Sequence, residues 1–225
     1  MQRMALKGVK TGFMVPKTTY FRNLGEIVSP EHTAIVVIDM QNDFCSPGGF
    51  FDKRSDLTLV REMMPRLEKF LSACRELGLK IVHLAMYIDP QRTTSPMCER
   101  WDRLGINEDY CMEGAWGGNF CDNLTPQPGE HVFPKYCYSG LTSQDFRAWL
   151  ESTNTRTLVL TGVATNICVE STAREAYMSG YYAVMVEDCV AAYSPEEQRM
   201  ALQNTKRYFG NVASSAELLR IWQQE

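Results

Sequence analysis

The sequence predicts an α/β protein in which helices cover both faces of a parallel sheet. Its 225 residues are 44% hydrophobic and 22% charged, as expected of a globular chain with a substantial core. Continuous apolar runs of strand length recur, and segments of helix length separate most of them. Repeated strand–helix units with wholly apolar strands form parallel sheets that are buried on both faces.

Each expected strand is an apolar run bounded by charged or turn residues. The run at 33–39, TAIVVID, ends in an acid, and RTLVLTGV at 156–163 is similarly apolar. We expect six strands, at 33–39, 80–88, 130–134, 156–163, 181–187 and 211–212.

Helical segments lie between these strands. In the longest, 55–77, one stripe carries Leu59, Met63, Leu67, Phe70, Leu71 and Cys74. Gly78 is placed to end this helix in a left-handed conformation. Further helices are expected at 142–152, at 166–179, from Pro195 and from Ser215.

The chain is expected to contain one domain, 30–225, preceded by an N-terminal arm, 1–29. Residues 1–22 contain five basic residues and no acid, which suits an arm lying on the fold or a targeting segment. Residues 89–130 show no clear periodicity. So long a stretch is either irregular and functional or contains short elements.

Charge and cysteine content limit the partners and the location. The 23 Lys and Arg against 27 Asp and Glu give a net charge of −4, which argues against nucleic acid or a membrane surface as a partner. No apolar run is long enough to cross a bilayer, and no signal-peptide core follows Met1. We therefore expect a cytoplasmic protein whose eight cysteines are thiols.

Chemically reactive side chains stand at the ends of three expected strands. Asp39 ends the first, Lys135 follows the third, and Cys168 lies just beyond the fourth, at the start of a helix. Ligands bind outside the carboxyl ends of parallel strands, so these residues form the candidate site. The helix N-terminus and a nearby cation would lower the pKa of the thiol. A carboxylate, an ammonium group and a thiol together predict a hydrolase with a cysteine nucleophile.

Each of these residues also has an ordinary structural interpretation. A carboxylate at a strand end often caps a turn, a lysine there is often solvated, and a cysteine in a first helical turn is often a small core residue. Other chemistries have less support. The sequence has no G-x-S-x-G, P-loop, G-x-G-x-x-G or H-E-x-x-H motif and no C-x-x-C pair.

Side chains near the strand ends are candidates for a substrate pocket. They are Asn42, Phe44, Tyr87, Trp116 and Tyr138. Asn42 is near the acid on the same loop, where it would bind substrate, orient Lys135 or serve only as a turn residue. Each aromatic residue is equally suited to packing.

Three separated motifs, in order, resemble the isochorismatase-like cysteine hydrolase family. They are AIVVIDMQNDFCSPGG at 34–49, PKYCYSG at 134–140 and LTGVATNICVESTAREA at 160–176, and VEDCVAA at 186–192 also fits. The resemblance covers about residue 30 to the end. It implies a Rossmann-like three-layer αβα fold with a six-stranded parallel sheet, and a catalytic triad of Asp39, Lys135 and Cys168.

The resemblance also implies details of the site. A cis peptide bond would join Val163 to Ala164, and the N–H groups of Ala164 and Cys168 would form an oxyanion hole. Nicotinamidases of the family bind a metal through an Asp-x-His element after the first helix. No such element occurs here, so we predict no metal and no cofactor.

Within the family, the motifs resemble the amidohydrolase branch. They are most similar to ureidoacrylate amidohydrolases and also to biuret, triuret and N-carbamoylsarcosine hydrolases. The implied function is cysteine-dependent cleavage of a C–N bond in a small linear ureido or carbamoyl compound, with residues 89–130 lining the pocket. A dimer or tetramer is implied as well. Two alternatives stay open: a nicotinamidase or isochorismatase-type hydrolase on the same fold, and a non-enzymatic protein whose Cys168 senses redox state.

Overall fold

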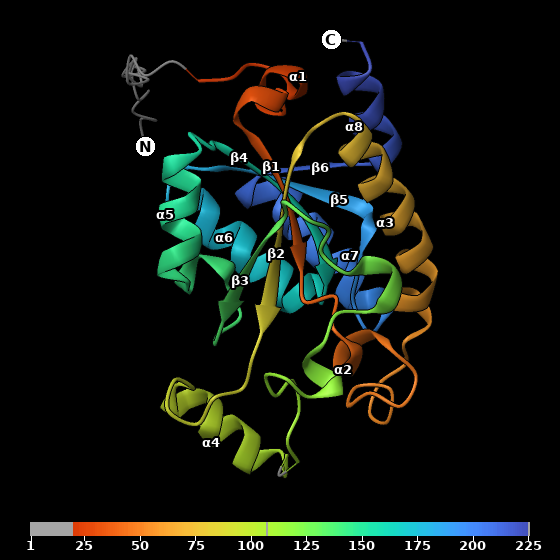
Figure 1. Cartoon of the computed structure of the whole chain (residues 1–225), viewed down its shortest axis with the longest axis vertical. Helices are drawn as coiled ribbons and strands as arrows, with labels where there is room; N and C mark the ends of the chain where they lie inside the picture. Colours follow the sequence, from red (N-terminus) through yellow and green to blue (C-terminus); the bar gives the residue numbers. More distant parts are fainter. Residues whose placement is uncertain (1–19, 107, 225) are drawn as a thin grey trace, which may run out of the picture.

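Six parallel strands form one open sheet in the order β3-β2-β1-β4-β5-β6 (Figure 1). The computed structural model describes residues 20–106 and 108–224. The strands are β1 Thr33–Ile38, β2 Lys80–Met86, β3 His131–Lys135, β4 Thr157–Val163, β5 Tyr182–Ala191 and β6 Asn211–Ala213. The predicted six-stranded parallel sheet is thus confirmed. The strand order reverses between β1 and β4, the type of point where such sheets bind ligands.

Eight α-helices connect or flank the strands among the described residues. They are α1 Leu24–Ile27, α2 Asn42–Cys45, α3 Thr58–Glu76, α4 Ser95–Arg103, α5 Gln144–Ser152, α6 Glu170–Met178, α7 Pro195–Asn204 and α8 Ser215–Trp222. A wider π-helical turn, Thr165–Val169, precedes α6, and another, Thr205–Phe209, follows α7.

The helices cover both faces of the sheet, which makes three layers (Figure 1). Alternate side chains of β1 pack into the two hydrophobic cores, one on each face of the sheet, because successive residues of a strand point to opposite faces. Ile35 and Val37 belong to the core that includes α3 and α8. Val36 and Ile38 belong to the core that includes α5 and α6. All six residues of β1 are buried, as its unbroken apolar sequence predicts.

Most elements differ from their expected bounds by a few residues, and two differences are larger. β5 continues to Ala191, although Glu187 and Asp188 interrupt its apolar run. The pairing with β4 shifts register there, and the Asp188 carboxylate accepts the backbone N–H of Ser215 at 2.7 Å, at the start of α8. The second difference is α4, a helix within 89–130, where apolar residues are few and only Met97 is buried.

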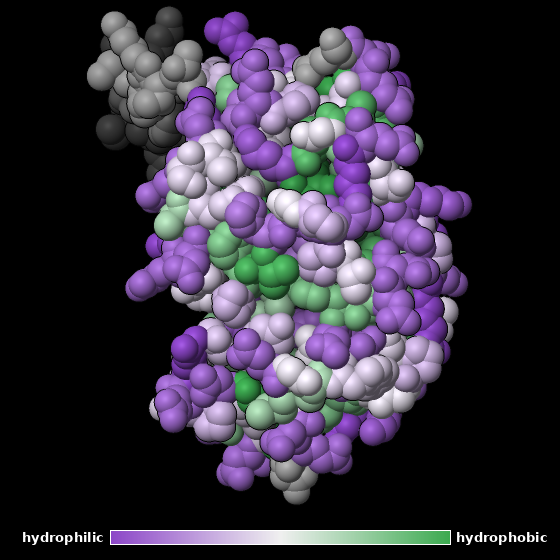
Figure 2. Space-filling model, in the orientation of Figure 1, coloured by the Kyte–Doolittle hydropathy of each residue, from purple (hydrophilic) through white to green (hydrophobic). Residues whose placement is uncertain are grey.

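The N-terminal region expected to be an arm is described only from Tyr20 onward, so the basic segment 1–19 lies outside the described residues. The Trp222 indole N–H donates to the Val28 carbonyl at 2.7 Å, which ties the residues before β1 to α8. None of the described helices is long and apolar enough to cross a membrane. The face in Figure 2 is largely hydrophilic, with hydrophobic side chains gathered near its middle.

Candidate active site

Asp39, Lys135 and Cys168 meet at the carboxyl ends of β1, β3 and β4. The Lys135 ammonium lies 2.8 Å from Asp39 Oδ2 and 3.5 Å from Cys168 Sγ. All three side chains are buried, with residue exposures of 0%, 1% and 5%. Three residues far apart in sequence therefore form one contiguous cluster, and none of them is a solvated surface group.

The backbone around Asp39 places its carboxylate in the cluster. Asp39 has a positive φ of 53°, so the chain turns sharply as it leaves β1. The neighbouring strand comes very close here. A Cβ on Gly162 would lie 2.1 Å from the Ile38 carbonyl oxygen, and Gly162 has a φ of +100°. Only glycine allows β4 to approach the end of β1 in this way.

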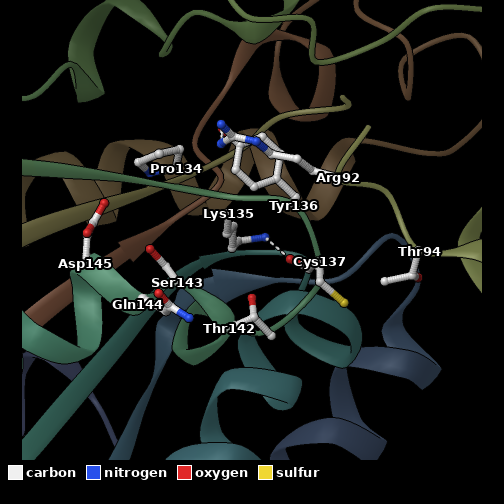
Figure 3. A pocket seen from close by; sticks show the side chains of 10 residues that line it. All are labelled: Arg92, Thr94, Pro134, Lys135, Tyr136, Cys137, Thr142, Ser143, Gln144 and Asp145. Atoms are coloured by element: carbon white, nitrogen blue, oxygen red, sulfur yellow. Dashed lines mark hydrogen bonds between the residues drawn. The ribbon is translucent and has the colours of Figure 1, made fainter. Parts of the chain in front are cut away.

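Lys135 is the last residue of β3, and its ammonium is enclosed by acceptors. Besides Asp39 and Cys168, it donates to the Cys137 carbonyl at 3.2 Å and approaches Met86 Sδ at 3.6 Å. Figure 3 shows the hydrogen bond to Cys137. These contacts compensate a cation that would otherwise be costly to bury.

Cys168 lies within the π-helical turn that links β4 to α6. The Val163–Ala164 peptide bond at the start of this turn is cis. The Thr172 hydroxyl donates to the Cys168 carbonyl at 2.7 Å, one turn further along the helix. The turn thus holds Cys168 at the N-terminal end of the combined helix, the position expected from the sequence.

Burial dominates the ionisation of the cluster. Burial, and then the Asp39 charge, raise the pKa of Cys168 well above its ordinary value, although Lys135 opposes them. Burial also raises the pKa of Asp39, against the lowering effect of Lys135. For Lys135, burial is the largest influence and lowers the pKa, but Asp39 and Cys168 together outweigh it and the pKa rises. The sequence suggests mainly influences that lower the pKa of Cys168, because desolvation is not visible in it. The direction for Cys168 favours a resting thiol, and Lys135 partly offsets the effect of burial on the pKa of Asp39.

Cys168 and Ala164 line a cavity of about 100 Å³. Most of its other walls are aromatic or aliphatic: Phe44, Phe50, Phe51, Met86, Ile106, Tyr110, Tyr138, Ile167 and Tyr193. Arg100, on α4, completes the lining. A small enclosed apolar cavity beside a buried thiol is a typical site for a small organic substrate.

The five candidate pocket residues are placed differently from one another. Phe44 and Tyr138 line the cavity, whereas Asn42, Tyr87 and Trp116 are not among its lining residues. The Asn42 side chain donates to the Trp116 carbonyl at 2.8 Å and accepts from the Ser46 hydroxyl at 2.7 Å. These bonds hold the loop around α2. The Trp116 side chain itself lies largely in solvent.

Two polar residues that the sequence does not single out support the site. The Gln41 amide donates to the carbonyls of Met86 and Gly118 and accepts the N–H of Met86, at 2.8–3.0 Å. The Asp43 carboxylate accepts the N–H groups of Phe50 and Cys111, at 3.0 and 2.7 Å. Both residues belong to the run that follows Asp39, so their nearness to the acid is the only signal in the sequence.

A second cavity, of about 450 Å³, borders Lys135 from the β3 side (Figure 3). Its walls are more polar and include Thr142, Ser143 and Asp145, near the start of α5. Figure 3 shows the Arg92 guanidinium against the Tyr136 ring, with its carbon 4.6 Å from the ring centroid. Lys135 thus borders this polar cavity and contacts Cys168, which lines the apolar one. In the part of the chain that the structure describes, no three His, Cys, Asp or Glu side chains form a group suited to a metal ion.

Comparison with known proteins agrees with this geometry. Residues 33–217 match the family model for the isochorismatase domain. The chain belongs to the isochorismatase family. Among this family's members, the ureidoacrylate amidohydrolase RutB of Azorhizobium caulinodans is 31% identical over 211 residues, covering 88% of this chain and 93% of that protein. The RutB of Pseudomonas syringae pv. syringae is 33% identical and covers 83% and 82%. The chain is accordingly a hydrolase.

Solved structures of family members share the fold. A cysteine hydrolase from Pseudomonas syringae pv. phaseolicola superposes with a TM-score of 0.76 at 24% identity, covering 88% of this chain and 95% of that one. An N-carbamoylsarcosine amidase from Thermoplasma acidophilum gives 0.66 at 27% identity, covering 81% and 96%. A nicotinamidase from Bacillus subtilis gives 0.69 at 25% identity, covering 81% and 99%. These neighbours differ in substrate, so the fold alone does not select one.

Proposed function

We propose that this protein is a cysteine-dependent amidohydrolase that cleaves a C–N bond of a small linear ureido or carbamoyl compound. The observation that carries the proposal is the buried cluster in which Lys135 contacts both Asp39 and Cys168. The names of its relatives supply the substrate class, since RutB is a ureidoacrylate amidohydrolase and the Thermoplasma protein acts on N-carbamoylsarcosine.

The proposed reaction begins with proton transfer from Cys168 to Asp39. Sulfur then attacks the substrate carbonyl, and Lys135 stabilises the negative charge that this creates. The backbone N–H groups of Ala164 and Cys168 hold the oxyanion. Ammonia or an amine leaves with the proton from Asp39, which produces a thioester on Cys168. Asp39 then accepts a proton from water, and the water hydrolyses the thioester.

The raised pKa of the Cys168 thiol fits this sequence of steps. A thiol that stays protonated until a substrate is bound needs a base beside it, and Asp39 is the carboxylate in reach. The Lys135 ammonium, 2.8 Å from that carboxylate, opposes the effect of burial on its pKa. A nicotinamidase remains the alternative on this fold. The expectations of a cytoplasmic location and of a dimer or tetramer belong to the same proposal.

The test is ammonia release from a panel that contains ureidoacrylate, biuret, triuret, N-carbamoyl amino acids and nicotinamide. We expect turnover of at least one ureido or carbamoyl compound. Cys168→Ser should lose nearly all of it, because serine has no histidine to activate its hydroxyl, while the melting temperature stays near wild type. The control is Cys45→Ser, which alters another buried thiol. Turnover of nicotinamide alone, or a Cys168→Ser variant within tenfold of wild type, would refute the proposal.

A further inference from the structure

Two segments beside the active site are held side by side by backbone hydrogen bonds. One segment links β1 to α2, and the other is the stretch 119–121 of the irregular region. The Cys121 N–H donates to the Met40 carbonyl, and the Asn42 N–H donates to the Asn119 carbonyl, both at 2.9 Å. The two segments therefore run antiparallel and in contact.

Two buried thiols, Cys45 and Cys121, meet where these segments pack together. Cys45 is the last residue of α2, and the exposures of the two residues are 1% and 2%. Their side chains form a hydrogen bond with each other. The Ser46 hydroxyl lies 3.6 Å from Cys121 Sγ, so a second polar hydrogen can point at the same sulfur.

The two thiols differ in how readily they ionise. The hydrogen bond from Cys45 lowers the pKa of Cys121, and the Ser46 hydroxyl acts in the same direction against burial. Burial, and then the contact with Cys121, raises the pKa of Cys45 well above its ordinary value. Cys121 is therefore the sulfur that ionises first, and Cys45 is the sulfur that keeps its proton. A thiolate beside a second thiol is the arrangement in which mild oxidation produces a disulfide.

A cavity of about 300 Å³ gives a small oxidant a route to this pair. Its walls include Cys45 and Ser46 together with residues of α3. Cys45 and Ser46 are also the residues that contact the sulfur of Cys121. The lining of this cavity shares no residue with the cavity beside Cys168. An oxidant can therefore approach the pair without passing the catalytic thiol.

We propose that Cys45 and Cys121 are a redox modification site, which hydrogen peroxide converts into a reversible disulfide that slows hydrolysis at Cys168. The Cys121 thiolate attacks one oxygen of the peroxide, which forms a sulfenic acid and releases hydroxide. The Cys45 sulfur then attacks the sulfenic sulfur, which forms the S–S bond and releases water. In total the two thiols lose two electrons and two protons, and one peroxide is reduced to two molecules of water.

The effect on the active site follows from the position of Cys45 in α2. A disulfide bond is about 2.05 Å long, so the two sulfurs must come closer together than a hydrogen bond holds them. Phe44, which precedes Cys45 in α2, lines the cavity beside Cys168. Forming the bond therefore displaces part of the cavity wall. This effect on turnover rests on the proposed function, whereas formation of the disulfide does not.

The test treats the folded protein with a small excess of hydrogen peroxide at neutral pH, blocks the remaining thiols with N-ethylmaleimide during denaturation and maps disulfides by mass spectrometry. We expect a peptide pair that joins Cys45 to Cys121 and that dithiothreitol separates. Cys74 and Cys189 are the control pair. They lie near each other in the same core, but burial raises the pKa of both, so they should stay thiols. In Cys45→Ser, dimedone should trap Cys121 as a sulfenic acid.

Turnover of the substrate found in the panel is measured on the same samples. Peroxide should lower the kcat/KM of the wild type by at least about fivefold, with recovery after dithiothreitol, because small displacements at an active site are costly to catalysis. Cys45→Ser cannot form the disulfide and should keep most of its untreated activity, although its Cys168 meets the same peroxide.

The outcomes separate this proposal from the proposed function. Absence of a disulfide between Cys45 and Cys121, or a disulfide between Cys74 and Cys189 that forms equally fast, would overturn the modification site. Equal inactivation of wild type and Cys45→Ser would show that oxidation of Cys168 causes the loss, and would overturn the effect on turnover. If the untreated protein hydrolyses no compound of the panel, the proposed function is refuted, and the disulfide map still decides the modification site.

Discussion

Lys135 acts on Cys168 at a distance of 3.5 Å, so its removal should be visible in the reactivity of the thiol. Lys135 lowers the pKa of Cys168 against the raising effects of burial and Asp39. In Lys135→Ala, alkylation of Cys168 by iodoacetamide should slow at pH 7, and the pH of half-maximal rate should rise. The rate is followed at each pH, and mass spectrometry locates the label because the chain has eight cysteines. Superimposable curves for variant and wild type would contradict the electrostatic role of Lys135.

Glu130 lies at the other end of β3 from Lys135, and its ionisation affects the stability of the folded protein. Burial opposes its ionisation, but hydrogen bonds from His83 and Arg75 outweigh burial and lower its pKa to about 2. A lowered folded-state pKa adds stability above the ordinary value of 4.5 and loses it as the pH falls toward 2.

Glu130→Gln should therefore reduce the free energy of unfolding by on the order of 2 kcal/mol at pH 7 and much less near pH 2. Urea unfolding at several pH values measures the difference. The control is Glu99→Gln, at an exposed pair with Arg103. An equal loss at both pH values would show that the effect of Glu130 does not come from its charge.

At the scale of elements, the closeness of β1 and β4 controls where Asp39 lies. Gly162→Ala would place a methyl group 2.1 Å from the Ile38 carbonyl oxygen, one residue before Asp39. We expect a loss of at least about 3 kcal/mol in the free energy of unfolding, or an inactive folded protein with displaced strands.

Gly180→Ala is the matched control for this substitution. Gly180 also has a positive φ, of +87°, but no atom lies within 4 Å of the added methyl group. Its cost should be about 1 kcal/mol, from the backbone conformation alone. Equal destabilisation of the two variants in urea unfolding would show that the contact with Ile38 has no special cost.

At the scale of the whole molecule, the proposed chemistry uses only groups of the chain itself. Asp39 supplies the base, Lys135 the cation and Cys168 the nucleophile, so catalysis should proceed without a metal ion. Dialysis against a chelator is expected to leave kcat/KM unchanged for the substrate found in the panel. Activity that is lost on dialysis and restored by zinc or iron would contradict this prediction.

The sequence by itself determined the parallel sheet and indicated the three residues that the structure brings together. Its strands are apolar runs such as TAIVVI. A strand buried on both faces must be apolar throughout, so such a strand can be recognised from sequence alone. The order of motifs then indicated Asp39, Lys135 and Cys168 at neighbouring strand ends. Their separation in the sequence does not say how far apart they lie in space. Each had an ordinary structural interpretation until the fold placed them together.

Only the tertiary structure decided the ionisation of the site and the wall of its cavity. Desolvation raises the pKa of Cys168, and desolvation depends on what surrounds a residue rather than on its sequence neighbours. Arg100 lies on α4, whose few apolar residues give no sign of contact with the cavity. Arg100 lines the cavity only because the chain folds this helix over the carboxyl end of the sheet, and local sequence does not indicate such a long-range contact.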